Sequence, residues 1–407
     1  MRKWKDKNTA RFLFNAAIIT SLLLCLGFLG LIYKYKDEKS PSQVIHSVYY
    51  RIFGLPSVQW NSATPESEGL DTNKLEELSK SLEAYNTSAL LVIRGGNIVF
   101  ERYKGKQKKT TKYSTAAMAK AVTAGPVLLT AISEGRISID DPLWKYYPEL
   151  KNDPIRSKIL IKHLVYHTSG IENVSFISGK HGKLTGWKAE YYENPDRRFL
   201  YSMTVAPVNF TPGTREEYSG VGYYALAYAV TRSIHGSKPD NIDAYLREKI
   251  MRPLEIPDTS WNLSYGKSHF IDDMKLYAFG SGATYTARAS ARIGELMLNR
   301  GIWNGQTLIK PEWIDIILAR HNETMDIVSE NHGWTLNIKK IWPSLPADAF
   351  AGIGGGHMIT LVIPSLDLVM VRYGKTLQDE NETFMEALDS KMFSSLMASV
   401  TGPSSRQ

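Results

Sequence analysis

The chain has 407 residues, 43% of them hydrophobic and 22% charged, a composition that excludes a disordered protein and is typical of a folded one. This length predicts one large domain or two closely packed subdomains. The net charge of +8 is concentrated near the start, where residues 1–40 hold eight Lys or Arg and three Asp or Glu. No basic stripe with interleaved aromatic residues follows, so the sequence predicts no nucleic-acid partner.

Residues 12–33 form an uncharged, mostly apolar run that is long enough to cross a bilayer as one helix. Several Lys and Arg precede it, and it ends without the small residues of a signal-peptide cleavage site. The pattern predicts an uncleaved single-pass anchor in the cell membrane, with residues 1–11 in the cytoplasm and the body of the protein outside it. The single cysteine, Cys25, lies in this run, so no disulfide can form within the exported part. Residues 34–63 are predicted to be a linker.

The first elements of the body are predicted to be a helix and a hairpin. Apolar residues recur at helical spacing over residues 70–85, where Asp71 is a candidate N-cap. Two strand-like runs, 89–93 and 98–103, flank Gly95-Gly96-Asn97, which is typical hairpin-turn chemistry.

The pattern then becomes helical, and it returns to strands near the end of the chain. A helix is expected over residues 115–134, and short helices with long loops over 140–277. Two strands, 358–363 and 366–372, precede an amphipathic helix over about 380–397. We therefore predict an α/β (α+β) fold over residues 64–400, in which an antiparallel sheet is built from N- and C-terminal segments, flanked by helices, and interrupted by a mainly helical subdomain.

Ala117 and Lys120 stand one helical turn apart. A serine at the first position would bring a hydroxyl within hydrogen-bond reach of the lysine amine, and a neutral lysine could remove its proton. Alanine cannot attack a substrate. Ser114 and Thr115 lie on other faces of an ideal helix and are expected to cap its start.

Tyr218 follows the turn-forming segment Thr211-Pro212-Gly213 and is expected at the tip of a loop. A tyrosine beside a lysine can shuttle protons, because the ammonium favours the phenolate. With 22 tyrosines in the chain, this residue alone is weak evidence for a site.

Three motifs taken together are specific: Ala117-x-x-Lys120, Tyr218-Ser219-Gly220, and Gly354-Gly355-Gly356-His357 before a terminal strand. The chain resembles the serine β-lactamase-like family, which includes class C type β-lactamases, penicillin-binding DD-peptidases, related esterases and aminohexanoate-oligomer hydrolases. The resemblance also covers residues 135–143, 163–170, 280–294 and 364–372.

This resemblance implies a role for each motif. Position 117 is the nucleophile position, Lys120 the base partner and Tyr218 the second proton-transfer residue. His357 is expected to help position the substrate or a proton. The backbone N–H of residue 117 and one on the strand near Met358, just after Gly356, are expected to form the oxyanion hole.

The chain departs from the family pattern at all three motifs. Ala117 removes covalent catalysis, Gly220 replaces the usual asparagine, and Gly356-His357-Met358 stands where β-lactamases have Lys-Thr-Gly. The expected ligand is therefore a small amide, an ester or a peptide-like oligomer rather than a β-lactam. No cofactor is implied, and the sequence indicates no oligomeric state.

A zinc site is the remaining candidate, because His163 and His167 stand four residues apart. No His-Glu-x-x-His pattern accompanies them, so we expect structural histidines and no metal. Three hypotheses about function stay open. They are a serine hydrolase disabled by a serine-to-alanine substitution, a natural pseudoenzyme that binds an envelope ligand, and residual hydrolysis by a water activated between Lys120 and Tyr218.

Overall fold

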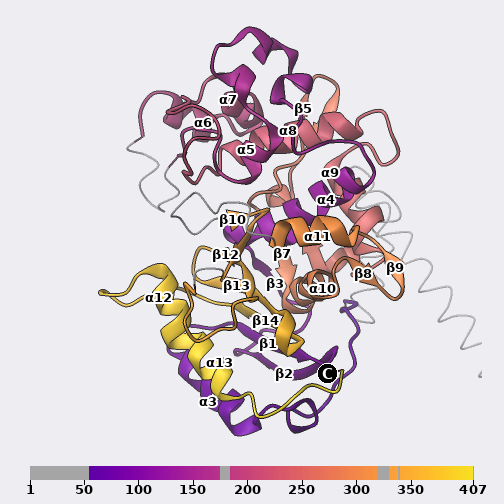
Figure 1. Ribbon diagram of the computed structural model, residues 1–407, viewed down its shortest axis with the longest axis vertical. Coiled ribbons are helices and arrows are strands. Elements are labelled where there is room, and N and C mark those ends of the chain that lie inside the picture. Colours follow the sequence, from indigo (N-terminus) through magenta and orange to yellow (C-terminus); the bar gives the residue numbers. More distant parts are fainter. Residues whose placement is uncertain (1–54, 175–183, 319–329, 338–339, 407) are drawn as a thin grey trace, which may run out of the picture. The chain divides into compact units, whose positions relative to one another are not determined.

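The computed structural model describes residues 55–174, 184–318, 330–337 and 340–406. The predicted anchor at 12–33 and residues 34–54 of the predicted linker lie outside the described residues. Residues 57–407 form one compact unit, whose elements are drawn in Figure 1.

A seven-stranded antiparallel sheet organises this unit (Figure 1). The strands, in spatial order, are β10 (Glu330–Asn331), β11 (Trp334–Leu336), β12 (Phe350–Gly354), β13 (Met358–Ile363), β14 (Leu368–Tyr373), β1 (Ala89–Arg94) and β2 (Asn97–Tyr103). The N-terminal hairpin joins the C-terminal strands directly, since Ala89 pairs with Tyr373 and Arg94 with Leu368. The predicted sheet from both ends of the chain is therefore present.

Helices cover both faces of the sheet. On one face lie α3 (Thr72–Glu83), α12 (Phe384–Leu388) and α13 (Ser394–Ala398), and on the other α4 (Gly125–Ser133) and α10 (Ala287–Leu298). Alternate residues of β14 face the two layers: Val369 and Val371 pack with α4 and α10, whereas Leu368 and Met370 pack with α3 and α13. Figure 1 shows α3 and α13 side by side on their face.

Most of the remaining helices form the upper part of Figure 1. They are α5 (Ile161–Val165), α6 (Trp187–Glu193), α7 (Arg198–Thr204), α8 (Gly222–Ile234) and α9 (Ile242–Leu246). This region also holds the hairpin of β5 (His269–Ile271) and β6 (Met274–Leu276), which the sequence analysis did not predict. A separate small sheet joins β4 (Trp261–Asn262) to β7 (Thr284–Thr286) and β7 to β3 (Lys112–Ser114). The chain continues through β8 (Ile302–Trp303), β9 (Gln306–Thr307) and α11 (Pro311–Leu318).

The helix predicted over 115–134 has three parts: a 3-10 turn at Ala116–Met118, a π turn at Lys120–Ala124, and α4. In the described part of the chain, Ala116–Ser133 is long and apolar enough to cross a membrane, but 83% of it is buried inside the protein, as in a core helix. The last predicted helix also starts later than expected, at Phe384, because Thr383 and Glu386 form a capping box there.

Candidate functional site

Position 117 lies in a strained turn at the start of the central helix. Ala116 has a left-handed backbone, with φ 46°, and Ala117 is partly exposed. The turn is fixed from β7, because the carbonyl of Ala283 accepts hydrogen bonds from the backbone N–H of Thr115 at 3.0 Å and from its Oγ1 at 2.9 Å. Thr115 is the N-cap residue by position, but its side chain makes no capping hydrogen bond. The Ser114 Oγ accepts from the Ala116 N–H at 3.3 Å.

The end of β12 lies directly against this turn. A Cβ atom built on Gly354 would be 2.2 Å from the carbonyl oxygen of Thr115 and 3.3 Å from the Cβ of Ala116. One built on Gly352 would be 2.5 Å from the Cβ of Ala121. Glycine is required at both positions because the strand and the turn approach more closely than any side chain permits. The wall that faces position 117 is therefore Gly354 and its neighbours.

Lys120 and Tyr218 meet as the sequence analysis predicted. The Lys120 side chain is buried, with 1% of its surface exposed, and its Nζ donates a hydrogen bond to the Tyr218 hydroxyl. The ammonium is 4.6 Å from the centre of the Tyr218 ring and 5.2 Å from that of Tyr223. Tyr218 is 40% exposed, so it connects the buried amine with the surface.

His167 holds the loop that carries Tyr218, a role that the sequence analysis missed. Its Nδ1 accepts from the backbone N–H of Ser219 at 3.1 Å, and its carbonyl accepts from that of Glu217 at 2.8 Å. The rings of His167 and Tyr218 are 4.6 Å apart. The available signal was that residues 163–170 resemble family sequence, which marked the segment without assigning this histidine to the tyrosine.

The two histidines considered for zinc are both used within the protein. Nδ1 of His163 accepts a hydrogen bond from the N–H of Leu160 at 3.2 Å, and Nδ1 of His167 accepts the one from the N–H of Ser219. Among the described residues, no group of three or more His, Cys, Asp or Glu is arranged to hold a metal ion.

His357 has a different role from the predicted one. Its side chain is completely buried and stacks on Phe384 with the ring centres 3.7 Å apart. Nδ1 accepts from the Leu377 N–H at 3.1 Å, and Nε2 donates to the Phe384 carbonyl at 2.9 Å. Both ring nitrogens are engaged, so His357 cannot also position a substrate. The prediction rested on the resemblance to the family's third motif, which faces the site, whereas the His357 ring turns into the packing beside α12.

Gly356 and Met358 lie beside this histidine. Gly356, with φ 81°, forms the turn between β12 and β13, and Met358 starts β13 opposite Gly354. Met358 lines a small pocket of about 320 Å³ together with Lys112 and Ser114. Because Met358 pairs with Gly354, its backbone lies close to the wall of the site.

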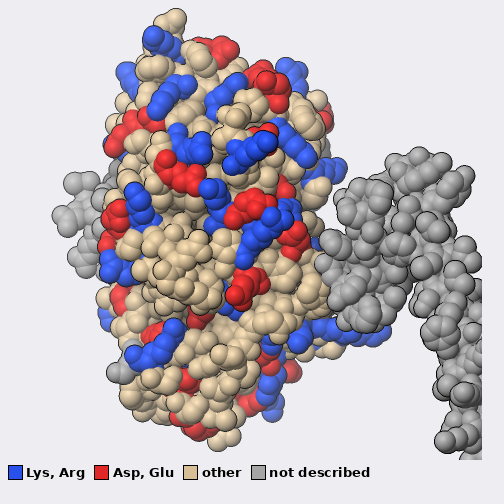
Figure 2. Space-filling model, turned by 90° about the vertical axis from the view of Figure 1, so that its right-hand side faces the viewer, with Lys and Arg blue, Asp and Glu red and all other residues tan. Residues whose placement is uncertain are grey.

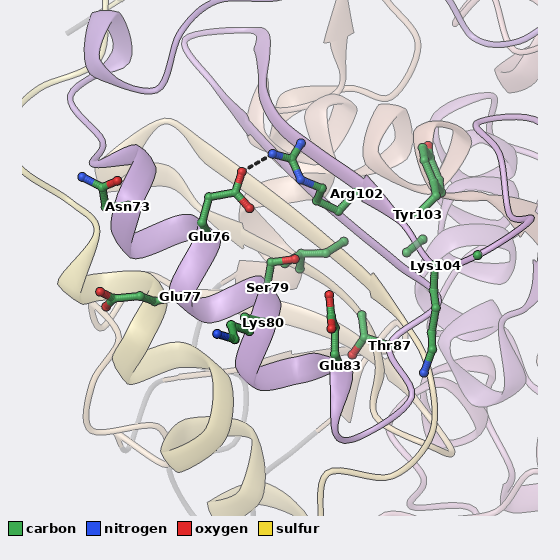
Figure 3. Close-up of a pocket in the computed structure, with 13 residues that line it drawn as sticks. Asn73, Glu76, Glu77, Ser79, Lys80, Glu83, Thr87, Arg102, Tyr103 and Lys104 are labelled. Atoms are coloured by element: carbon green, nitrogen blue, oxygen red, sulfur yellow. Dashed lines mark hydrogen bonds and ion pairs between the residues drawn. The ribbon is translucent and has the colours of Figure 1, made fainter.

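A wider cleft, of about 970 Å³, lies elsewhere, between α3 and the strands β1 and β2 (Figure 3). Its lining is strongly charged, and Glu76 and Arg102 form an ion pair across it. Because α3 packs on the opposite face of the sheet from α4, this cleft is separate from Lys120. Figure 2 shows Lys and Arg interspersed with Asp and Glu on the visible face rather than gathered in one field.

The fold and the Lys120–Tyr218 pair define a class of serine hydrolase. The family model described as Beta-lactamase matches residues 76–388, so the chain belongs to this β-lactamase/transpeptidase-like family.

The chain is 25% identical over 252 residues to the 6-aminohexanoate-dimer hydrolase of Paenarthrobacter ureafaciens, and the match covers 60% of each protein. It is 23% identical over 223 residues to an N-acetylmuramyl-L-alanine amidase of Bacillus subtilis, with 48% of each covered. The chain therefore spans only about half to three fifths of these two relatives. A penicillin-binding protein homologue from Caulobacter crescentus has the same fold, with a TM-score of 0.58, 16% identity, and coverage of 80% of this chain and 99% of that one.

Proposed function

We propose that this site is that of an amide or ester hydrolase that works through an acyl-enzyme, and that Ala117 leaves the chain able to bind a carbonyl substrate but not to cleave it. The observation that carries the proposal is the hydrogen bond from the buried Lys120 to Tyr218, one helical turn from position 117. Burying an amine is costly unless its partners compensate, so a site arranged for proton transfer accounts for the pair.

The chemistry follows from a serine at position 117. The neutral amine of Lys120 takes the hydroxyl proton while the serine oxygen attacks the carbonyl, and the C–O bond of the tetrahedral intermediate forms. Tyr218 relays a proton to the leaving amine or alcohol as the scissile bond breaks, which leaves the acyl-enzyme. Water then attacks the acyl group through the same pair and releases the acid. The N–H of residue 117 and one from the Gly354–Met358 segment supply the oxyanion contacts.

Small amides, esters and peptide-like oligomers are the proposed ligands. The relative from P. ureafaciens is named for a 6-aminohexanoate dimer and that from B. subtilis for an N-acetylmuramyl-L-alanine amide. This chain also lacks the Lys-Thr-Gly that would recognise a β-lactam carboxylate. The apolar run at 12–33 supports a single-pass anchor in the cell membrane, with the site outside the cytoplasm.

A natural pseudoenzyme that binds an envelope peptide or small ligand is the second candidate. The observation in its favour is Ala117 itself, which occupies a turn whose contacts to β7 and β12 are complete without a hydroxyl.

Restoring serine tests the proposal. The full chain and its Ala117→Ser variant are assayed for the burst and steady-state hydrolysis of p-nitrophenyl acetate and for labelling by a fluorophosphonate. Ala117→Ser combined with Lys120→Met is the matched control for a serine without its base. We expect only Ala117→Ser to label and turn over. If it is folded but neither labels nor turns over, the hydrolase proposal fails and the pseudoenzyme leads.

A further inference from the structure

Tyr265 is a large exposed side chain in a strained turn. Ser264, Tyr265 and Gly266 are three consecutive residues with left-handed backbones, at φ 53°, 55° and 74°. A bulky residue rarely adopts this conformation, which is strained for any residue with a side chain. The conformation presents the Tyr265 side chain to solvent with 64% of its surface exposed. A strained backbone that holds an aromatic ring in solvent suggests that the ring has a functional role, such as contact with a ligand.

The turn around Tyr265 is firmly held. The Ser264 hydroxyl accepts from the Ala278 N–H at 3.0 Å, and the Tyr265 N–H donates to the Gly282 carbonyl at 2.7 Å. The ring lies on Gly282, where a Cβ atom would be 2.5 Å from both Cδ2 and Cε2 of the tyrosine. The missing side chain at Gly282 therefore provides the seat for this ring.

The segment beneath the ring belongs to the wall of the site. At one end, Gly280 lies against Tyr223, where a Cβ atom would be 2.7 Å from the Cβ and 2.8 Å from the ring carbon Cδ1 of Tyr223, and the Tyr223 ring centre is 5.2 Å from the Lys120 nitrogen. At the other end, Ala283 binds Thr115, two residues before position 117. Gly282 lies between these ends, so the Tyr265 ring rests on a segment that borders both Thr115 and Tyr223.

We propose that Tyr265 is a specificity-determining residue, which stacks on an aromatic or flat apolar substituent of the scissile carbonyl. The inference rests on the proposed function because it takes the space above position 117 as the place of the carbonyl. Aromatic pairs contribute beyond their buried area, so removing the ring weakens a matching ligand roughly two- to tenfold.

Tyr192 and the buried Tyr224 lie near Tyr265. Burial raises the pKa of both hydroxyls, and the Tyr265 hydroxyl acts on each in the same direction, so the three lie within electrostatic reach of one another. Tyr192 and Tyr224 therefore remain neutral at physiological pH.

Binding to the chain as it stands tests this proposal without turnover. Ligand-observed NMR titrations measure the Kd of three amides. N-benzylacetamide carries a ring on the nitrogen side of the amide, N-methyl-2-phenylacetamide carries one on the carbonyl side, and N-methylacetamide carries none. We expect at least one aromatic amide to bind more tightly than N-methylacetamide, and Tyr265→Ala to weaken that amide roughly two- to tenfold while N-methylacetamide is unaffected.

Two variants serve as controls. Tyr265→Phe keeps the ring and should retain the affinity. Phe270→Ala removes a ring that is 70% exposed on the β5–β6 hairpin and should change nothing. The proposal is overturned if neither aromatic amide binds, if Tyr265→Ala leaves every Kd unchanged, or if Phe270→Ala has an equal effect. If the Ala117→Ser protein is folded but inactive and its binding of an aromatic amide still depends on Tyr265, the hydrolase proposal fails. The proposed role of Tyr265 in binding aromatic ligands would then still hold.

Discussion

The Lys120 amine donates a hydrogen bond to the Tyr218 hydroxyl, although 98 residues separate the two in the chain. Lys120 lies in the buried π turn that precedes α4, and Tyr218 lies in the loop that precedes α8. The tyrosine reaches solvent and the lysine does not. The pair therefore provides a route by which a proton can pass between the buried amine and a ligand at the surface.

This geometry predicts unequal roles for the two residues in the Ala117→Ser background. Lys120→Met should abolish p-nitrophenyl acetate turnover and fluorophosphonate labelling, because nothing else then takes the serine proton. Tyr218→Phe should lower kcat about 10²–10⁴-fold, as expected for loss of a proton-transfer group, while the serine still labels slowly. Steady-state kinetics and labelling rates distinguish the two. Equal loss of labelling in both variants would contradict this assignment.

The sheet was largely predictable because its central strands carry local signals. Apolar runs flank the turn at Gly95-Gly96, which is where it was expected. They also flank a 3-10 turn at Pro364–Leu366, after which β14 begins two residues later than expected, at Leu368. β12 was not predicted. Its sequence, Phe350–Gly354, contains two glycines and resembles a loop, but those glycines are there because the turn at 115–121 packs against the strand. Tertiary approach, which no local pattern records, decides that element.

The site was predictable only where a side chain acts directly. Lys120 and Tyr218 belong to motifs, and the structure brings them together. His167 acts through the backbone of Ser219, so no residue pattern exposes its role. His357 stands in a motif but points into the core. The direction of a side chain after a glycine turn depends on packing against distant segments, here Leu377 and Phe384.

Replacing His357 should therefore affect stability and not catalysis. His357→Leu leaves the Leu377 N–H and the Phe384 carbonyl without their partner and should cost about 1–3 kcal/mol of unfolding free energy. Burial lowers the pKa of His357, so the unfolded chain binds more protons below pH 6.5 and the contribution of the ring fades as the pH falls. Urea unfolding at pH 5 and pH 7.5 measures both effects. In Ala117→Ser, kcat/KM well below the unfolding temperature should stay unchanged, and a selective loss there would return His357 to the site.

Gly354→Ala should displace the turn that carries position 117. The added Cβ would lie 2.2 Å from the Thr115 carbonyl oxygen, which is backbone and cannot swing away. Overpacking of this kind costs about 1–3 kcal/mol, and in Ala117→Ser it should also lower turnover. Gly402→Ala is the control, because a Cβ at Gly402 meets nothing within 4 Å. Thermal unfolding and ester hydrolysis of the two variants are compared. Equal melting temperatures would show that β12 and the turn can separate without cost.

Glu295 should make the protein less stable as the pH rises towards neutrality. Burial raises its pKa from 4.5 to about 7, with Arg292 and Arg406 opposing part of the shift. Between these two values the folded state keeps a proton that the unfolded state has lost, so the unfolding free energy falls with increasing pH. The shift corresponds to about 3 kcal/mol at most. Glu295→Gln removes the penalty and should stabilise the protein at pH 8 but not at pH 4, less a small loss from the contact with Arg406 at 3.5 Å.

Glu101→Gln is the matched control with the opposite sign. Burial raises the pKa of Glu101, but two hydrogen bonds from Arg288, at 2.7 and 2.6 Å, outweigh it and lower the pKa overall. Its stabilising contribution is present above the ordinary pKa and is lost as the pH falls, so Glu101→Gln should destabilise at pH 8 and have a smaller effect at pH 4. Urea unfolding of both variants at the two pH values checks the pair. If Glu295→Gln also loses stability at pH 8, its carboxylate is a favourable partner of Arg406, and the predicted penalty of burial is wrong.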